Sequence, residues 1–186
     1  MTRITVFAAL LIGGTLLSAA CAPRGSGAGG SGAGDDDSSD DDDDDAQTEW
    51  LYEGEGPELW HDCGVASADS WGGCDGHCVG DADHLVYGPY ATLPAGTYEA
   101  VWRLKTNDGD RSSLDILQID VTTEQGSRYL AERRIDRSEF SAAGVWREFS
   151  LTFSHDGSGT LEYRVQFIDS HRPCVSIDWI RITTLS

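Results

Sequence analysis

The sequence predicts an all-β domain, a closed or two-layer antiparallel β-sandwich, over residues 49–186. Apolar and polar residues alternate in several short runs, which is the pattern of strands that bury one face. Turn-forming segments rich in Gly, Asp and Asn separate these runs. No run of about twelve or more residues carries a convincing helical stripe, and strands without helices favour a closed or two-layer antiparallel fold.

Four runs show the alternation most clearly, and we expect each of them to form a strand with one apolar face. The apolar positions are Tyr98, Ala100, Trp102 and Leu104; Leu117, Ile119 and Val121; Phe149, Leu151 and Phe153; and Tyr163, Val165 and Phe167. The turn signal Leu-Pro-Ala-Gly at 93–96 introduces the first run. We expect about seven or eight strands in all, with one short turn of helix at Arg134–Ala143.

Residues 1–20 are expected to be a signal peptide that exports the chain. A basic residue, Arg3, precedes an apolar run at 4–17, and small residues follow this run up to Cys21. The apolar run is shorter than the roughly 20 residues needed to cross a bilayer, which favours an export signal over a spanning helix.

The end of this leader, Leu-Ser-Ala-Ala-Cys at 17–21, resembles the lipobox of bacterial lipoproteins, except that Ser18 replaces the usual apolar residue. The resemblance implies cleavage before Cys21, lipidation of Cys21, and anchoring in the bacterial cell envelope, at the outer membrane or the cell surface. Ordinary secretory cleavage at the same small residues would instead release a soluble protein, and this alternative stays open.

The chain has five cysteines, an odd number for an exported protein. Lipidation of Cys21 would leave an even set, and an oxidising compartment then favours two disulfides. The other four cysteines are Cys63, Cys74, Cys78 and Cys174, which allow three connectivities. Because three of them lie close together in the sequence and the fourth lies near the C-terminus, every full pairing ties an early loop to a late one.

A zinc site is the alternative, because His61 and His77 lie among the cysteines. Structural zinc favours cysteine pairs separated by about two to four residues, and only Cys74 and Cys78 approach that spacing. Export therefore favours disulfides over zinc.

Residues 21–48 are expected to form a disordered tether between the leader and the domain. The segment is rich in Gly, Ser, Ala and Asp, with nine aspartates between Asp35 and Asp45. Such a composition cannot offset the entropy cost of ordering the chain, and repulsion between the aspartates extends it. A low-affinity calcium buffer is the alternative, although nothing in the segment fixes an ordered shell of oxygen ligands.

The charge of the chain excludes some classes of partner. The formal net charge is −19, and residues 46–186 still hold 11 Lys and Arg against 23 Asp and Glu. Nucleic acids and anionic membrane surfaces need clustered Lys and Arg, so we expect neither as a partner, and we expect membrane contact only through the lipid. The remaining length is typical of one domain that buries its own core, which predicts a monomer.

Three motifs, in this order, resemble the β-jelly-roll carbohydrate-binding modules related to families 6, 35 and 36. They are Tyr-Glu-Gly-Glu at 52–55, the segment YGPYATLPAGTY at 87–98, and Ile-Asp-Trp-Ile-Arg-Ile at 177–182. The resemblance covers most of residues 50–186, although the cysteine-rich segment at 60–83 departs from these modules. It implies a jelly-roll sandwich that binds carbohydrate, with its first and last strands as neighbours.

Carboxylates near the first strand are candidate calcium ligands. Glu53 and Glu55 would lie on one face of a strand, about 6.6 Å apart. The resemblance implies that Asp178 from the last strand joins them, and a cation would relieve the repulsion between three carboxylates. Oxygen ligands suit Ca²⁺, and the resemblance implies a structural calcium site at the same residues. The alternative is that the glutamates form a solvated face of an edge strand.

Sugar recognition needs aromatic faces that stack on C–H surfaces and fixed polar groups that bind hydroxyls. Trp71 lies in the Gly- and Asp-rich segment where the alternation is lost, and Tyr90 follows a Gly-Pro turn, so both are candidate ligand contacts. The resemblance implies that ligands bind at loops on one edge of the sandwich. Asp169 and Arg172 lie in a late loop that belongs to these edge loops. A disulfide from Cys174 to the early loop would bring these four residues together.

For Trp71, and for Trp60 in the same segment, covering the end of the sandwich is the alternative role. We interpret the chain as a non-catalytic carbohydrate-binding lipoprotein, with a protein-interaction or adhesion module as the alternative. An enzyme is not expected, because glycosidase carboxylates flank a bond roughly 5–10 Å apart in a cleft, whereas Glu53 and Glu55 are neighbours on one strand. The sequence also contains no phosphate-binding loop or nucleophile elbow.

Overall fold

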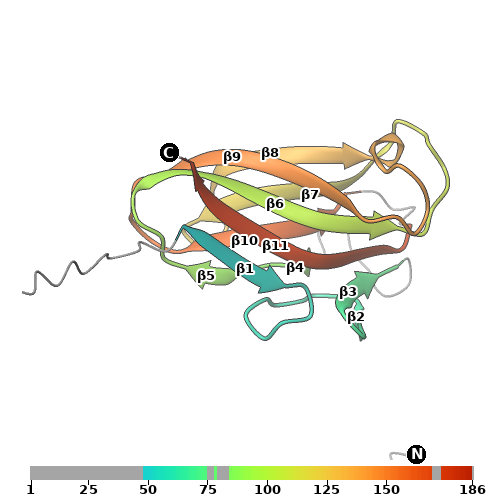
Figure 1. The fold of residues 1–186 in the computed structure, drawn as a ribbon, viewed down its shortest axis with the longest axis horizontal. Helices are drawn as coiled ribbons and strands as arrows, with labels where there is room; N and C mark the ends of the chain where they lie inside the picture. The colour runs from blue at the N-terminus through green and yellow to red at the C-terminus, as the bar shows by residue number, and fades with distance from the viewer. Residues whose placement is uncertain (1–47, 75–77, 79–83, 169–172, 186) are drawn as a thin grey trace, which may run out of the picture. The chain divides into compact units, whose positions relative to one another are not determined.

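The domain consists of two antiparallel β-sheets packed face to face, as Figure 1 shows for a computed structural model of the chain. The structure describes residues 48–74, 78, 84–168 and 173–185. The predicted all-β sandwich is confirmed. The predicted signal peptide at 1–20, Cys21 and nearly all of the tether lie outside the described residues. Within the part of the chain that is described, no helix is both long and apolar enough to cross a membrane.

One sheet has six strands and holds both the first and the last strand of the fold. Its strands are β1 (Glu49–Glu53), β2 (Val65–Ser67), β3 (Ser70–Gly73), β6 (Gly96–Thr106), β9 (Arg147–His155) and β11 (Val175–Leu185). Their order is β2-β3-β11-β6-β9, and β1 also pairs with β11. The first and last strands are therefore neighbours, as the resemblance implied, with Glu53 opposite Trp179.

The other sheet has five strands and is built around β10. Its strands are β4 (His84–Val86), β5 (Pro89–Ala91), β7 (Asp115–Thr123), β8 (Arg128–Asp136) and β10 (Leu161–Phe167). The order is β4-β10-β7-β8, and β5 pairs with β10 on the same side as β4. Two short strands, β4 and β5, therefore share one edge of this sheet.

The apolar faces of the predicted runs form the core between the sheets. Trp102 of β6, Ile119 of β7 and Tyr163 of β10 are fully buried, and Phe149 and Phe153 of β9 are nearly so. Because side chains alternate along a strand, the opposite faces of β6 and β9 point outward, whereas those of β7 and β10 are also largely buried and hold Asp120, Glu162 and Arg164. The predicted apolar positions are therefore confirmed as core, except that Leu151 is only partly buried against it.

The number of strands is higher than expected, because the described residues hold eleven rather than seven or eight. Segment 60–83 was expected to be a loop, yet it contains β2 and β3. These strands form by pairing: β3 hydrogen-bonds to β11, and β2 to β3. Strands of three or four residues are too short to show a period-two pattern, so the sequence gives no local sign of them.

The helical turn expected at Arg134–Ala143 is shorter than predicted. β8 occupies the first part of this range, paired with β7 along most of its length. A 3-10 turn, Arg137–Glu139, follows, and the Asp136 carboxylate caps it by accepting a hydrogen bond from the Glu139 amide. Backbone pairing with β7 thus overrides the local preference of this charged segment for helix.

Two disulfides join the four cysteines of the domain, as predicted. They are Cys63–Cys78 and Cys74–Cys174. The second bridge joins the residue after β3 to the residue before β11, so it ties the early segment to the late one. Because all four sulfur atoms are bonded in pairs, they are not available as zinc ligands. His77, the other residue of the zinc alternative besides His61, lies outside the described residues.

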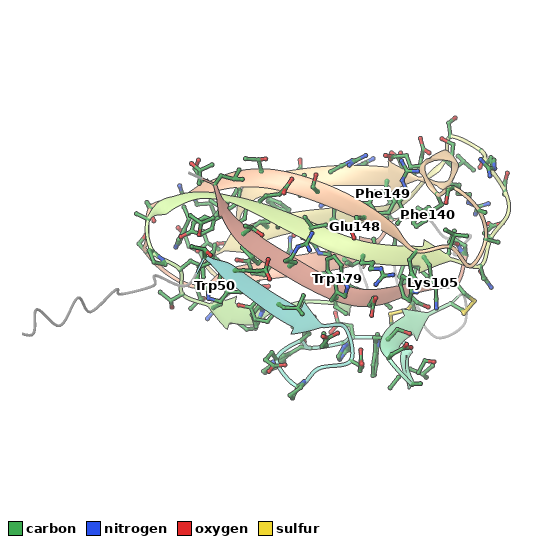
Figure 2. All side chains as sticks on the ribbon, viewed as in Figure 1. Trp50, Lys105, Phe140, Glu148, Phe149 and Trp179 are labelled. Carbon is green, nitrogen blue, oxygen red and sulfur yellow. A yellow bond between two sulfur atoms is a disulfide. The ribbon has the colours of Figure 1, made fainter. Side chains whose placement is uncertain are left out.

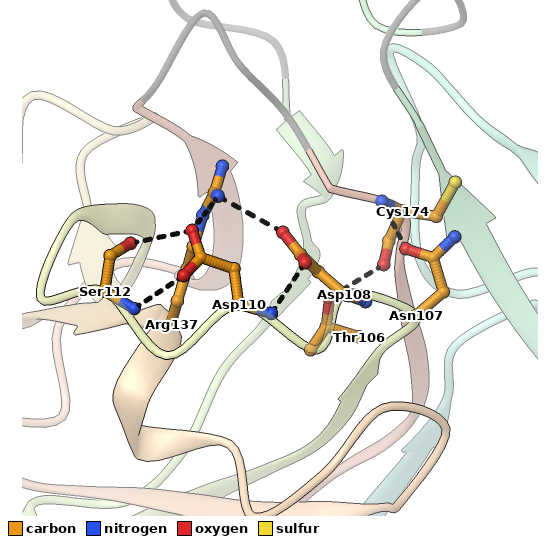
Figure 3. A network of polar contacts seen from close by, with 7 residues as sticks. All are labelled: Thr106, Asn107, Asp108, Asp110, Ser112, Arg137 and Cys174. Atoms are coloured by element: carbon orange, nitrogen blue, oxygen red, sulfur yellow. Dashed lines mark hydrogen bonds and ion pairs between the residues drawn. The ribbon is translucent and has the colours of Figure 1, made fainter.

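A polar network holds the loop between β6 and β7 against the start of β11 (Figure 3). The Asn107 amide donates to the Cys174 carbonyl at 3.0 Å, and the Cys174 amide donates to the Asn107 side-chain oxygen at 3.0 Å. Arg137 forms ion pairs with two carboxylates of the loop, Asp108 at 3.2 Å and Asp110 at 2.9 Å. These bonds and the second disulfide fix the backbone at Cys174 independently of each other.

Replacing Cys74 and Cys174 together by Ser should lower the free energy of unfolding by about 4–5 kcal/mol, because this bridge joins residues 100 positions apart and restricts the unfolded chain most. The matched double replacement of Cys63 and Cys78, 15 positions apart, should cost about 3 kcal/mol. Urea unfolding of the oxidised protein and of both variants measures the difference. A larger loss for the Cys63–Cys78 pair would contradict the explanation by loop entropy.

Candidate functional site

An aromatic cluster of Trp60, Tyr87 and Tyr90 lies at the edge of the five-stranded sheet that carries β4 and β5. Trp60 and Tyr87 exchange two backbone hydrogen bonds, from the Trp60 amide at 2.8 Å and from the Tyr87 amide at 2.9 Å. Their ring centroids are 6.0 Å apart, and the Tyr90 ring lies nearly perpendicular to Trp60 at 6.1 Å. Trp60 is 58% exposed, so the cluster presents a large flat ring to solvent.

The backbone at Tyr90 adopts a conformation that bulky residues rarely occupy. Its φ angle is 64°, in the left-handed region, and it follows Gly88, whose φ is 112°. This conformation costs on the order of 1–3 kcal/mol and persists only where the surrounding structure determines it.

A buried carboxylate, Glu162 of β10, lies beside this cluster, opposite Pro89 in the pairing of β10 with β5. Burial raises the pKa of Glu162, although Arg164 and His84 act in the opposite direction. The Oε1 atom of Glu162 has no hydrogen-bond partner among the described residues. Because an unpaired buried acceptor is costly, this oxygen needs a partner that the described residues do not supply.

The two tyrosines of the cluster are suited to donate hydrogen bonds. Burial raises the pKa of Tyr87, and the nearby Asp62 carboxylate raises it further. Burial also raises the pKa of Tyr90, followed by the charge of Glu162, while Arg164 lowers it. Both phenols therefore stay protonated at neutral pH; the Tyr87 hydroxyl is hydrogen-bonded to Asp62, which leaves Tyr90 as the O–H donor beside the Glu162 carboxyl group.

A buried ion pair between β10 and β7 lies next to Glu162. Arg164 lies opposite Asp120, and its Nε and Nη2 atoms donate to the two carboxylate oxygens at 2.6 and 3.2 Å. Burial acts to lower the pKa of Arg164, but the hydrogen bonds and charge of Asp120 outweigh it and leave the pKa raised. The guanidinium also lies 5.2 Å from the ring centroid of Tyr129 on β8.

Trp71, a predicted ligand contact, lies on β3 and has one face covered by another ring. The His61 ring stacks on it with a centroid distance of 3.8 Å. The Trp71 Nε1 atom donates to the Cys63 carbonyl at 2.7 Å, and His61 Nε2 lies 2.7 Å from the Gly54 carbonyl. These contacts fix Trp71 beside the disulfide-linked segment and leave less of its ring open than that of Trp60.

The outer face of the six-stranded sheet carries two further tryptophans, Trp146 and Trp179, the second of which is labelled in Figure 2 with Lys105. Cations lie over both rings: Lys105 is 4.1 Å from the Trp146 centroid, and Arg181 is 5.0 Å from the Trp179 centroid. Arg103 lies between the two rings, 5.5 and 5.9 Å from their centroids. Because these cations sit over the rings, a sugar could stack there only by displacing a charge.

The predicted calcium ligands Glu53, Glu55 and Asp178 lie at the junction of β1 and β11. β1 ends at Glu53, so Glu55 lies beyond the strand and the expected two-residue strand spacing does not apply. Arg103 holds one oxygen of Asp178 at 2.8 Å, while a buried oxygen of Glu55 has no partner among the described residues. No set of three or more His, Cys, Asp or Glu side chains in the described ranges is arranged to hold a metal ion. The described carboxylates therefore do not form a ready shell, and calcium stays a prediction from the resemblance.

The structure brings together part of the predicted ligand-binding set. Within the described residues, ring contacts join Tyr90 to Trp60 and Trp71 to His61, rather than Trp71 to Tyr90. Asp169 and Arg172 lie outside the described residues. Tyr87 and Glu162 complete the cluster. Tyr87 lies in the motif at 87–98 but is not among the predicted ligand contacts, and Glu162 gives no sign in the sequence, because each reaches the cluster by pairing with a distant segment. Trp60 did carry a sign, as a tryptophan in a segment without alternation.

No protein-family model matches the sequence, and no curated protein matches it either. Solved structures do match. The xylan-binding module CBM15 is similar over 76% of this chain and 93% of its own, with a TM-score of 0.51 and 16% identity. The C-terminal CBM6 of LamC, a marine laminarinase from Zobellia galactanivorans, is similar over 73% of this chain and 99% of its own, with a TM-score of 0.47 and 17% identity. The match to CBM15 shows that the chain shares the fold of that module.

Replacing Arg164 by Met should lower the free energy of unfolding by about 3–5 kcal/mol, because Asp120 is fully buried and would be left without its partner. The double variant Arg164→Met, Asp120→Leu should recover most of the loss, since it leaves no buried charge. Urea unfolding at neutral pH measures both. A double variant as unstable as the single one would show that packing, rather than the unpaired charge, sets the cost.

Replacing Glu53 by Gln should raise the free energy of unfolding at pH 7. Burial first, then Glu55 and Asp178, raise the pKa of Glu53 in the folded state. The folded state therefore binds its proton more tightly than the unfolded state, so stability falls as pH rises above about 4.5 and is not reduced below it. Because Glu53 is exposed, the gain should stay below about 1 kcal/mol.

Thermal melts of both proteins at pH 3 and pH 7, with calcium and with a chelator, check this expectation. The gain in the Glu53→Gln variant should vanish at pH 3. If calcium instead stabilises the wild-type protein and Glu53→Gln abolishes that effect, a cation rather than repulsion governs these carboxylates.

Proposed function

We propose that the protein binds carbohydrate through the aromatic cluster and does not cleave it. The exposed ring of Trp60, flanked by Tyr87 and Tyr90, carries the proposal. A flat aromatic ring stacks on the C–H face of a sugar, and a few fixed polar groups orient its hydroxyls. The Tyr90 phenol can donate and Glu162, whose Oε1 atom has no partner among the described residues, can accept, so the cluster offers both kinds of partner that a sugar hydroxyl uses.

The carboxylates near the cluster support binding rather than hydrolysis. Glycoside cleavage needs an acid and a base on opposite sides of the scissile bond. Asp120 is fully buried with both oxygens held by Arg164, so it is not free to act on a substrate. Of the other carboxylates near the cluster, Asp62 is paired with His84 at 3.1 Å and Glu162 is buried, so neither is a free acid or base, and Glu162 suits a hydrogen bond to a ligand.

The placement of the domain in the cell belongs to the same proposal. A lipid on Cys21 would anchor the protein in the bacterial envelope, and the acidic tether at 21–48 would hold the domain away from the membrane. A domain held in this way would capture polysaccharide outside the cell or at its surface. Because the solved module that shares the fold is described as xylan-binding, xylan is the first polysaccharide to test.

Replacing Trp60 by Ala should weaken binding to the retained polysaccharide about tenfold or more, because the stacking surface is lost. Trp146→Ala is the matched control, since cations cover that ring, and it should bind like wild type. Affinity electrophoresis against a panel that starts with xylan, followed by calorimetry on the best ligand, measures both. A melting curve of each variant separates loss of binding from loss of fold.

Two outcomes would overturn the proposal. Unchanged binding by a folded Trp60→Ala variant would place the sugar elsewhere. Failure of the wild-type protein to retain any polysaccharide, together with capture of an envelope protein, would favour the adhesion module instead.

A further inference from the structure

A pocket of about 210 Å³ opens where the two sheets meet at the ends of β7 and β9. It is lined by Thr123, Arg128, Leu130, Ser154, His155 and Asp156. Thr123 ends β7, Arg128 and Leu130 begin β8, and Ser154 and His155 end β9. None of the residues of the aromatic cluster lines this pocket, and β10 lies between its Thr123 wall and the edge strand β5.

Two buried polar side chains line the pocket without a partner. Thr123 is 3% exposed and His155 is 6% exposed. The hydroxyl of Thr123 and the Nε2 atom of His155 form no hydrogen bond within the described residues. Buried polar groups are nearly always paired, by protein or by a bound molecule, so two such groups in one pocket point to a ligand that pairs them.

The charges of the pocket are balanced. Arg128 lies only loosely against Glu124, at 3.9 Å, and Asp156 has one carboxylate oxygen held by the backbone amide and hydroxyl of Ser158. The Ser158 side-chain hydrogen bond, more than any other cause, lowers the pKa of Asp156, which is therefore ionised at neutral pH. Among the residues that line the pocket, Arg128 and Asp156 carry opposite charges, so an anion would meet Asp156, a cation would meet Arg128, and the balance favours a neutral ligand.

The size and walls of the pocket limit the ligand further. The volume matches about seven water molecules and is smaller than the roughly 300 Å³ of pockets that hold drug-sized molecules. Leu130 supplies an apolar wall, while the remaining lining residues offer both donors and acceptors. A small ring with C–H faces and several hydroxyls satisfies these features together.

We propose that this terminal pocket binds a small neutral polyol the size of one sugar ring, using Thr123, His155, Arg128 and Asp156 to pair its hydroxyls. The hydroxyl of Ser154, which lies 3.4 Å from that of Thr97, is a further contact. This pocket is separate from the aromatic cluster, so the inference does not rest on the proposed function. It gives the domain a second binding site between the sheets, suited to one sugar unit rather than to the face of a polysaccharide chain.

The test is a titration of the ¹⁵N-labelled protein with D-xylose, D-glucose and myo-inositol, followed by NMR. Saturable shifts of the amide signals of Thr123, Ser154 and His155 are expected with at least one of them. D-Glucuronate and D-glucosamine should bind more weakly, because each carries a charge into a balanced pocket. Tighter binding of either charged probe, or no saturable shift with any neutral probe, would overturn the proposal.

Thr123→Val removes the unpaired hydroxyl and keeps the shape of the side chain, so it should weaken binding about tenfold without lowering the melting temperature. Thr122→Val is the matched control, because Thr122 also carries a buried unpaired hydroxyl but does not line the pocket. Equal effects of the two variants would overturn the proposal. The indole N–H signal of Trp60 reports on the aromatic cluster in the same spectra, so loss of binding at the pocket and loss of binding at the cluster are distinguished.

Discussion

The last strand, β11, is the element on which the rest of the domain depends. It pairs with β6 on one side and with both β1 and β3 on the other, so the six-stranded sheet has no continuous ladder without it. Its apolar residues Ile177, Ile180 and Ile182 are fully buried between the sheets. Just before it, Cys174 is fixed by a disulfide and by the hydrogen bonds of Asn107. One strand thus sets the position of β3, which carries Trp71.

The sequence could predict the parts of this fold that depend on local pattern. Period-two alternation located the core faces of β6, β7, β9 and β10, and the cysteine count predicted two disulfides. It could not predict β8, whose run of Arg and Glu suits a helix, because pairing with β7 decides its conformation. The short strands β2 and β3 were missed for the same reason, since hydrogen bonds to β11 form them.

The candidate site was harder to predict than the fold because its geometry is built across strands. Tryptophan in a segment without alternation pointed toward Trp60, but nothing local pairs it with Tyr87 or places Glu162 beside Tyr90. The same limit applies in the opposite direction to Trp146 and Trp179, because cations from β6 and β11 lie over their rings. A tryptophan on a sheet face is open to a ligand only when the residues opposite it leave its ring uncovered.

Lys105 has a practical consequence, because it is the only lysine in the chain. Its ammonium group lies over Trp146, on the outer face of the six-stranded sheet, whereas the aromatic cluster lies at an edge of the other sheet. Amine-directed chemistry therefore has one side-chain target. A fluorophore or a surface linker coupled to Lys105 would sit at a defined point on the opposite sheet. The fluorophore would quench the fluorescence of Trp146 before that of Trp60.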